Sequence, residues 1–279
     1  MIIEDVMSTN LIVGYVPGSI KDALETLAKN NVSGMPILKK NTNNVVGVIT
    51  RTDIFKNSDE DQIALVMNED FHYIKKDQDI SDAAKLLFEN RIHGLPVINN
   101  KKNLVGIISP KDIIKKMLLK NDCSINQYFS NLVVPIYENT PINIVMEIIS
   151  ITNENALPIL NEKLLLTGII SDGDLFKLST IQEGIEHSNI GLGDDEDQWT
   201  WEGIRDTVRL YYSTTHVTLP SIAVKDVMIT DIKKVTKNTP INEVANIMIK
   251  NDVSHIPIVN ADDRLVGMVS DIDLMACIF

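Results

Sequence analysis

The sequence predicts an α/β (α+β) protein made of four β-α-β-β-α repeats that pair into two modules. One observation is a strand-like segment with a central proline that occurs four times along the 279-residue chain. A second is the apolar, glycine-containing strand that follows each of these segments and ends in a hydroxyl residue. Three repeats are nearly contiguous and an insertion separates the fourth. The prolines that mark the repeats are Pro36, Pro96, Pro158 and Pro257.

Each repeat shows the same order of predicted elements. A short apolar stretch precedes a helix whose apolar residues recur at intervals of three and four, as at Ile20, Ala23, Leu24 and Leu27. Two short strands joined by a polar turn and a closing helix complete the unit. A unit this small cannot bury enough apolar surface alone, so we expect repeats 1 and 2, and repeats 3 and 4, to pair through their helices across a pseudo-twofold axis. The predicted domains are residues 1–60, 61–122, 123–180 and 223–279, with an insertion at 181–222.

Composition excludes several classes of function. The net charge of −12 and the pI of about 4.8 argue against nucleic-acid binding, which needs a basic surface. The sequence has no membrane-spanning run and no secretory signal, so we expect a cytoplasmic protein without a membrane partner. Cys123 and Cys277 lack a CxxC spacing, and no metal site is predicted. No nucleophile elbow, P-loop or HExxH motif is present, so we expect no catalytic residues and no enzyme activity.

The insertion contains the acidic run Asp194–Asp197 and both tryptophans, Trp199 and Trp201. Helical spacing predicts a connecting helix that packs an aromatic stripe on the core. The alternative is a docking surface, or arginines that reach a bound phosphate. The stripe consists of Trp201, Ile204, Val208 and Tyr211, with Arg205 and Arg209 on another face.

A Ser/Thr-x-x-Asp motif ends the second strand of every repeat. It can be a helix-capping box, which only stabilises the helix, but capping boxes prefer the longer Glu or Gln. A short carboxylate can instead accept both hydrogen bonds of a ribose diol, while the hydroxyl suits a phosphate. Four Asp residues therefore favour a ligand site. The pairs are Thr50 and Asp53, Ser109 and Asp112, Ser171 and Asp174, and Ser270 and Asp273.

With these motifs the sequence resembles a chain of four cystathionine-β-synthase (CBS) domains. The resemblance covers nearly everything except the insertion, and it implies two Bateman modules with nucleotide-binding clefts between their sheets. It implies that Asp53, Asp112, Asp174 and Asp273 hold ribose, and that Thr50, Ser109, Ser171 and Ser270 face phosphate. No catalytic cofactor is implied.

Four repeats in one chain is also the plan of the gamma subunits of AMP-activated protein kinases, which form a flat disc. This resemblance implies AMP, ADP and ATP as ligands, and a kinase or another regulated protein as the effector. A homodimer is a further expectation. His93 and Lys111 match phosphate-contacting positions there. The chain departs from that family at Ser33 and Gly94, where arginines are expected, and it keeps Asp112, which the family lacks.

Charge near the motifs differs between the two halves. Arg51, Lys111 and His93 belong to the first module, whereas Asp172 and Asp271 belong to the second. We therefore expect ADP and ATP to prefer the first module, and the second to take AMP or stay empty. His255, beside a strand proline, is a further candidate nucleotide-binding residue. Two alternatives remain open. One is a different ligand in the same fold: S-adenosylmethionine, whose sulfonium needs no cation, a cyclic dinucleotide or a metal-linked nucleotide. The other is a structural module without ligand.

Overall fold

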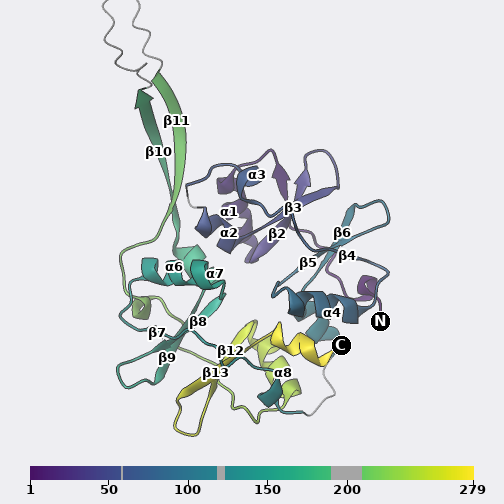
Figure 1. Cartoon of the computed structure of the whole chain (residues 1–279), viewed down its shortest axis with the longest axis vertical. Coiled ribbons are helices and arrows are strands. Elements are labelled where there is room, and N and C mark those ends of the chain that lie inside the picture. The colour runs from purple at the N-terminus through teal and green to yellow at the C-terminus, as the bar shows by residue number, and fades with distance from the viewer. Residues whose placement is uncertain (58, 118–122, 190–208) are drawn as a thin grey trace, which may run out of the picture.

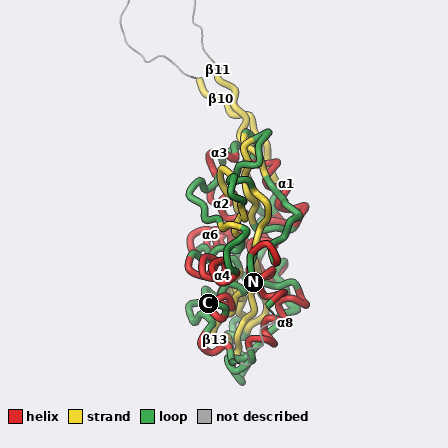
Figure 2. Tube along the Cα trace, turned by 90° about the vertical axis from the view of Figure 1, so that its right-hand side faces the viewer, coloured by secondary structure: helices red, strands yellow, loops and turns green. Residues whose placement is uncertain are grey.

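The computed structural model describes residues 1–57, 59–117, 123–189 and 209–279. Four small α/β units surround a common centre, and a long hairpin extends away from them (Figure 1). In the perpendicular view the body formed by the four units is narrower (Figure 2). The four units are the four predicted repeats.

The first two repeats have the expected element order. Repeat 1 contains β1 (Gly14–Val16), α1 (Ile20–Asn30), β2 (Gly34–Lys39), β3 (Val45–Thr50) and α2 (Arg51–Lys56). Repeat 2 contains β4 (Ile74–Lys75), α4 (Ile80–Glu89), β5 (Leu95–Ile98), β6 (Leu104–Ile108) and α5 (Pro110–Lys116).

The last two repeats follow the same plan. Repeat 3 contains β7 (Ile136–Tyr137), α6 (Ile142–Thr152), β8 (Ala156–Leu160), β9 (Leu166–Ser171) and α7 (Asp172–Leu178). Repeat 4 contains α8 (Ile241–Asn251), β12 (His255–Val259), β13 (Leu265–Ser270) and the 3-10 helix η4 (Asp273–Cys277). Its first strand is reduced to one parallel bridge between Val235 and Ile258.

Each of the first three sheets has three strands, of which the first is parallel and the third antiparallel to the central strand. The central strand therefore carries the repeat's proline with a neighbour on both sides. Helix α1 shows why the adjoining helices form. Ser19 caps its start, and the four apolar residues predicted from their spacing are all buried.

A short helical turn precedes each repeat and belongs structurally to the other repeat of its module. Behind each turn a large side chain covers a strand glycine of the partner repeat. Met7 covers Gly106 and Met67 covers Gly47, so repeats 1 and 2 exchange their leading segments. Met228 on Gly168 and Phe129 on Gly267 do the same for repeats 3 and 4. The turns are η1 (Ile3–Asp5), α3 (Ile63–Val66), η2 (Ile125–Gln127) and η3 (Val224–Asp226).

The helices pack between modules, which differs from the prediction that helices pair within a module. One apolar core joins repeats 1 and 3 and includes Leu27, Phe55, Ile149 and Phe176. A second core joins repeats 2 and 4. The reason is that the exchanged segments and the sheets already form the contact inside each module. The apolar helix faces are thereby left to meet across the centre.

The part of the insertion that is described is a strand hairpin. Strands β10 (Thr180–Asn189) and β11 (Arg209–Thr218) pair antiparallel along their full length. The predicted helix is therefore wrong at Arg209 and Tyr211. Residues 209–218 are rich in aromatic and β-branched types, and such composition favours a strand. The acidic run 194–197, Trp199, Trp201, Ile204, Arg205 and Val208 lie outside the described residues. No helix in the described part of the chain is long and apolar enough to cross a membrane.

The glycines under the exchanged segments give a testable consequence. A Cβ at Gly267 would lie 2.6 Å from the Phe129 ring and 2.7 Å from the Ser130 carbonyl oxygen. Gly267→Ala should therefore destabilise the protein by about 1–3 kcal/mol through overpacking. The control is Gly94→Ala, whose Cβ would meet nothing closer than 3.8 Å. Urea unfolding that ranks both variants as equally stable would contradict this account of the module interface.

Candidate functional site

The Ser/Thr-x-x-Asp motif folds in the same way in repeat 1 as in the other repeats. Strand β3 runs directly into α2, and Thr50 is the extended N-cap residue between them. Both the backbone N–H and the hydroxyl of Thr50 donate to Oδ2 of Asp53, at 2.8 and 2.6 Å. The N–H of Asp53 in turn donates to the Thr50 hydroxyl at 3.2 Å. The motif is thus a complete capping box.

This finding corrects the sequence argument that Asp is a poor capping-box residue. Because the strand enters the helix with the N-cap N–H close to the first turn, the shorter Asp reaches it. The same pattern of hydrogen bonds occurs between Ser109 and Asp112, Ser171 and Asp174, and Ser270 and Asp273. The Ser or Thr hydroxyl could donate to a phosphate only if its hydrogen bond to the Asp carboxylate were broken.

The other carboxylate oxygen, Oδ1, distinguishes three repeats from the fourth. Asp53, Asp112 and Asp174 are half-buried, and among the described residues nothing hydrogen-bonds their Oδ1. In repeat 4, Oδ1 of Asp273 accepts a hydrogen bond from Arg91 of repeat 2 at 2.6 Å. Asp273 therefore uses both of its oxygens within the protein.

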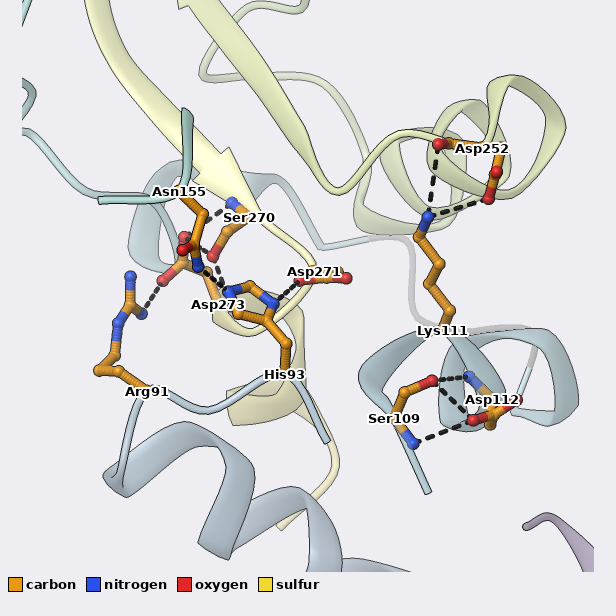
Figure 3. Close-up of polar contacts among 10 residues, drawn as sticks. All are labelled: Arg91, His93, Ser109, Lys111, Asp112, Asn155, Asp252, Ser270, Asp271 and Asp273. Carbon is orange, nitrogen blue, oxygen red and sulfur yellow. Dashed lines mark hydrogen bonds and ion pairs between the residues drawn. The ribbon is translucent and has the colours of Figure 1, made fainter. Parts of the chain in front are cut away.

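Repeat 2 reaches repeats 3 and 4 at the centre through His93 (Figure 3). One ring nitrogen of His93, Nε2, contacts the side-chain amide of Asn155. The other, Nδ1, lies 3.5 Å from Oδ1 of Asp271. The ring of His255 is 5.9 Å away between centroids. His93 and His255 thus come together as a pair, while Asn155 and Asp271 complete the cluster.

Arg51 forms the corresponding contact between repeats 1 and 3. Its guanidinium lies 3.7 Å from Asp172 and over the ring of Phe176, and both charged side chains are buried. A Cβ at Gly173 would lie 2.5 Å from the Arg51 nitrogen, so the glycine leaves room for it. Arg51 and Asp172 occupy the same position of the motif in their two repeats.

Lys111 makes a third contact between modules. Its ammonium group donates to Oδ1 of Asp252 at 2.9 Å and to the Asp252 carbonyl oxygen at 3.3 Å. Asp252 is 78% exposed, so the ion pair is one of the weak, solvent-screened kind. Figure 3 shows Lys111 pointing from α5 toward the end of α8, away from the His93 cluster.

These contacts change the physical basis of the prediction that ADP and ATP prefer the first module. The sequence assigned positive groups to the first half and negative groups to the second, but the fold pairs them. Arg51 neutralises Asp172, and His93 lies against Asp271. Lys111 is the cation among these whose partner is mostly exposed. A preference of ADP and ATP for the first module therefore rests on Lys111 rather than on a charge difference between halves.

Sequence reasoning missed Arg91 and Asn155. Both precede a repeat proline, Arg91 by five residues and Asn155 by three. An alignment of the four repeats on their prolines could have found Arg91. In that alignment Arg91 shares its position with Asn31, Asn153 and Asp252, and it is the only cation of the four.

Burial shifts the pKa values of ionisable groups at the contacts between modules. Burial, with a smaller effect from His93, lowers the pKa of His255 to about 4. Burial raises the pKa of Asp172, although Arg51 opposes the shift. At Asp271 burial is the largest single effect and acts to raise the pKa, but His93, His255 and Lys111 together outweigh it and the net pKa is lowered.

A comparison with protein-family models decides the family. The CBS domain model matches residues 3–60, 62–119, 130–180 and 224–279. The chain belongs to the CBS domain family. The resemblance inferred from the motifs is therefore confirmed, and so is the fold of four CBS repeats.

Full-length relatives share this CBS architecture. Protein MJ1225 from Methanocaldococcus jannaschii is 21% identical over 95% of this chain and 94% of its own. Its crystal structure superimposes with a TM-score of 0.80 over the whole of both chains, and it has been proposed as an archaeal homolog of g-AMPK. A conserved Pyrococcus horikoshii protein superimposes with a TM-score of 0.66 at 21% identity, again over both full chains.

Two kinds of enzyme, inosine-5′-monophosphate dehydrogenase and homoserine O-acetyltransferase, are among the relatives, and this chain matches only a small part of each. Inosine-5′-monophosphate dehydrogenase from Thermoplasma acidophilum is 32% identical over 35% of this chain, which is 20% of the enzyme. The similarity is therefore to a minor portion of that enzyme.

The low pKa of His255 predicts a pH dependence of stability. An unfolded histidine titrates near pH 6.5 and the folded one near 4, so between these values the unfolded chain binds more protons. The stabilisation is complete above about pH 6.5 and is lost as the pH falls toward 4. Lowering the pH from 7 to 5 should cost about 1–2 kcal/mol through this group.

The matched variant is His255→Gln, which cannot titrate but keeps a polar side chain beside His93, Arg91, Asp271 and Asp273. Chemical denaturation at both pH values should show a smaller pH effect in the variant. Equal pH effects in the two proteins would show that folding leaves the pKa of His255 at its ordinary value, and would contradict this account.

Proposed function

We propose that this protein is a non-catalytic regulatory CBS protein that binds adenine nucleotides, AMP, ADP and ATP, and signals energy state to a partner protein. The observation that carries the proposal is that, in the part of the chain that the structure describes, nothing hydrogen-bonds Oδ1 of Asp53, Asp112 or Asp174. In each case Oδ2 is held by the helix start, so the carboxylate is fixed in orientation before a ligand arrives.

A fixed carboxylate oxygen suits a ribose diol. The two hydroxyls of a ribose are adjacent donors, and a charged acceptor binds them more strongly than a neutral one. Because the capping box already restrains the side chain, little conformational entropy is lost on binding. This geometry supports recognition of a nucleoside by its sugar at Asp53, Asp112 and Asp174.

Lys111 supports a phosphate rather than a neutral nucleoside at repeat 2. It is the residue immediately before Asp112, and its partner Asp252 is mostly exposed. An ion pair of this kind contributes about 0–1 kcal/mol, so a bound phosphate can displace it at little cost. Lys111 is thus available to the charged end of a nucleotide whose ribose is held by Asp112.

S-adenosylmethionine is the second candidate ligand, and one observation favours it. The buried cation Arg51 already has an acidic partner in Asp172. A sulfonium ligand would need the ribose carboxylate and no further cation, so it would leave this pair in place.

The positions of the motifs support the proposed regulatory role. Arg51, Lys111 and Arg91 each join a motif or its surroundings in one module to the other module. A ligand that disturbs these contacts changes how the two modules pack, and a partner that recognises one packing would sense occupancy. The effector protein, a homodimer and a cytoplasmic location remain part of the proposal.

The first prediction tests ribose recognition. Asp53→Asn or Asp112→Asn keeps an oxygen for the helix cap but removes the charged acceptor, an interaction worth about 1.5–3 kcal/mol. AMP affinity at the changed site should fall by about one to two decades, measured by isothermal titration calorimetry.

Helix α1 offers a matched control for these variants. Ser19 and Asp22 repeat two of the motif's three hydrogen bonds on an exposed helix start: the Ser19 hydroxyl donates to Asp22 at 2.8 Å and accepts from the Asp22 N–H at 3.1 Å. Asp22→Asn should leave AMP binding unchanged. If Asp53→Asn and Asp112→Asn also leave it unchanged, the carboxylates are helix caps only and the proposed function fails.

The second prediction separates the two ligand classes by stabilisation. A ligand that binds only the folded protein adds about 2.7 kcal/mol per site at 100 times its dissociation constant. Thermal unfolding should shift upward with AMP, and the shift should be smaller in Lys111→Met. A shift with S-adenosylmethionine alone, unaffected by Lys111→Met, would favour the sulfonium ligand.

A further inference from the structure

Arg91 stands at a backbone position where its side chain is unusual. A residue one or two positions after the first long helix of each repeat, five residues before the repeat's proline, has a positive φ of between 51° and 57°. Asn and Asp tolerate this conformation better than long side chains do. Repeats 1, 3 and 4 have Asn31, Asn153 and Asp252 there, whereas repeat 2 has Arg91. A residue that strains the backbone needs a compensating contact elsewhere.

That contact is the bond to Asp273. The Arg91 guanidinium reaches Oδ1 of Asp273 at 2.6 Å, and the Asp273 side chain is only 9% exposed (Figure 3). Oδ2 of Asp273 is taken by the N–H and the hydroxyl of Ser270. The oxygen that stays free in Asp53, Asp112 and Asp174 is therefore covered in repeat 4.

The 1–3 interface provides an internal comparison. Asn31 occupies the position of Arg91 in repeat 1, and its side chain is too short to play the same part toward repeat 3. Asp174, the motif carboxylate of repeat 3, keeps Oδ1 free among the described residues. The two interfaces thus share their fold and differ in whether an arginine reaches the motif carboxylate.

We propose that Arg91 is a specificity-determining residue that closes the fourth Ser/Thr-x-x-Asp site to ligand. This inference rests on the proposed function, since it assigns which of the four carboxylates receives a ribose. The diol and the guanidinium compete for the same oxygen of Asp273. Asp53, Asp112 and Asp174 bind ligand in the wild-type protein, and Asp273 does not.

The test is a cycle of four proteins: wild type, Arg91→Asn, Asp273→Asn and the double variant. Arg91→Asn introduces the residue type that repeat 1 has at this position, and Asn tolerates the left-handed backbone. Equilibrium dialysis with radiolabelled AMP counts the ligand bound per chain, and a thermal melt verifies that each protein is folded. Lys85→Gln, at an exposed position of α4, the helix that precedes Arg91, is the control and should bind as the wild type does.

Arg91→Asn should bind one more equivalent of AMP than the wild type, and Asp273→Asn in that background should remove it. Asp273→Asn alone should leave the count unchanged. The proposal is overturned if Asp273→Asn alone removes one equivalent, or if folded Arg91→Asn gains none while the wild type binds AMP. Should Arg91→Asn unfold, Arg91→Gln carries the same expectation. Absence of AMP binding in all four proteins would instead refute the proposed function.

Discussion

The chemistry proposed for this protein depends on the different roles of the two carboxylate oxygens of the motif Asp. In repeats 1, 2 and 3, Oδ2 of the motif Asp accepts hydrogen bonds from the Ser or Thr that caps the closing helix, and in repeat 4 it accepts the same bonds from Ser270. This contact ends the strand, starts the helix and fixes the side chain at the same time. In Asp53, Asp112 and Asp174 this leaves one oriented oxygen, Oδ1, without a hydrogen-bond partner among the described residues. The helix-capping interpretation therefore accounts for Oδ2, and the proposed ligand role concerns Oδ1.

The second constraint is the way in which the modules meet. Within a module, exchanged segments and sheets form the contact, so the helices must bury their apolar faces against the other module. This packing brings motif residues of opposite charge together across the centre, as with Arg51 and Asp172. Charge that is separated along the sequence is thereby largely neutralised in space. Binding sites built on such contacts are coupled to the packing of the modules.

Most of the fold could be predicted because four copies of one pattern reinforce each other. The central prolines, the helix spacing around Leu27 and the motif Asp residues all indicated the CBS repeat, and the family comparison confirmed it. The packing of helices between modules could not be predicted, because the exchange of leading segments leaves no signal in a single repeat. The covering of Asp273 by Arg91 depends on residues 182 positions apart in the chain, and no local pattern links them.

The most direct test of this account compares AMP with 2′-deoxy-AMP. The two ligands share base and phosphate and differ only in one hydroxyl of the diol that Oδ1 is assigned to bind. Calorimetric titration of the wild-type protein should show that 2′-deoxy-AMP binds about ten- to a hundredfold more weakly, the loss of one charge-assisted hydrogen bond. Equal affinities would contradict the claim that the oriented carboxylate oxygen recognises the ribose.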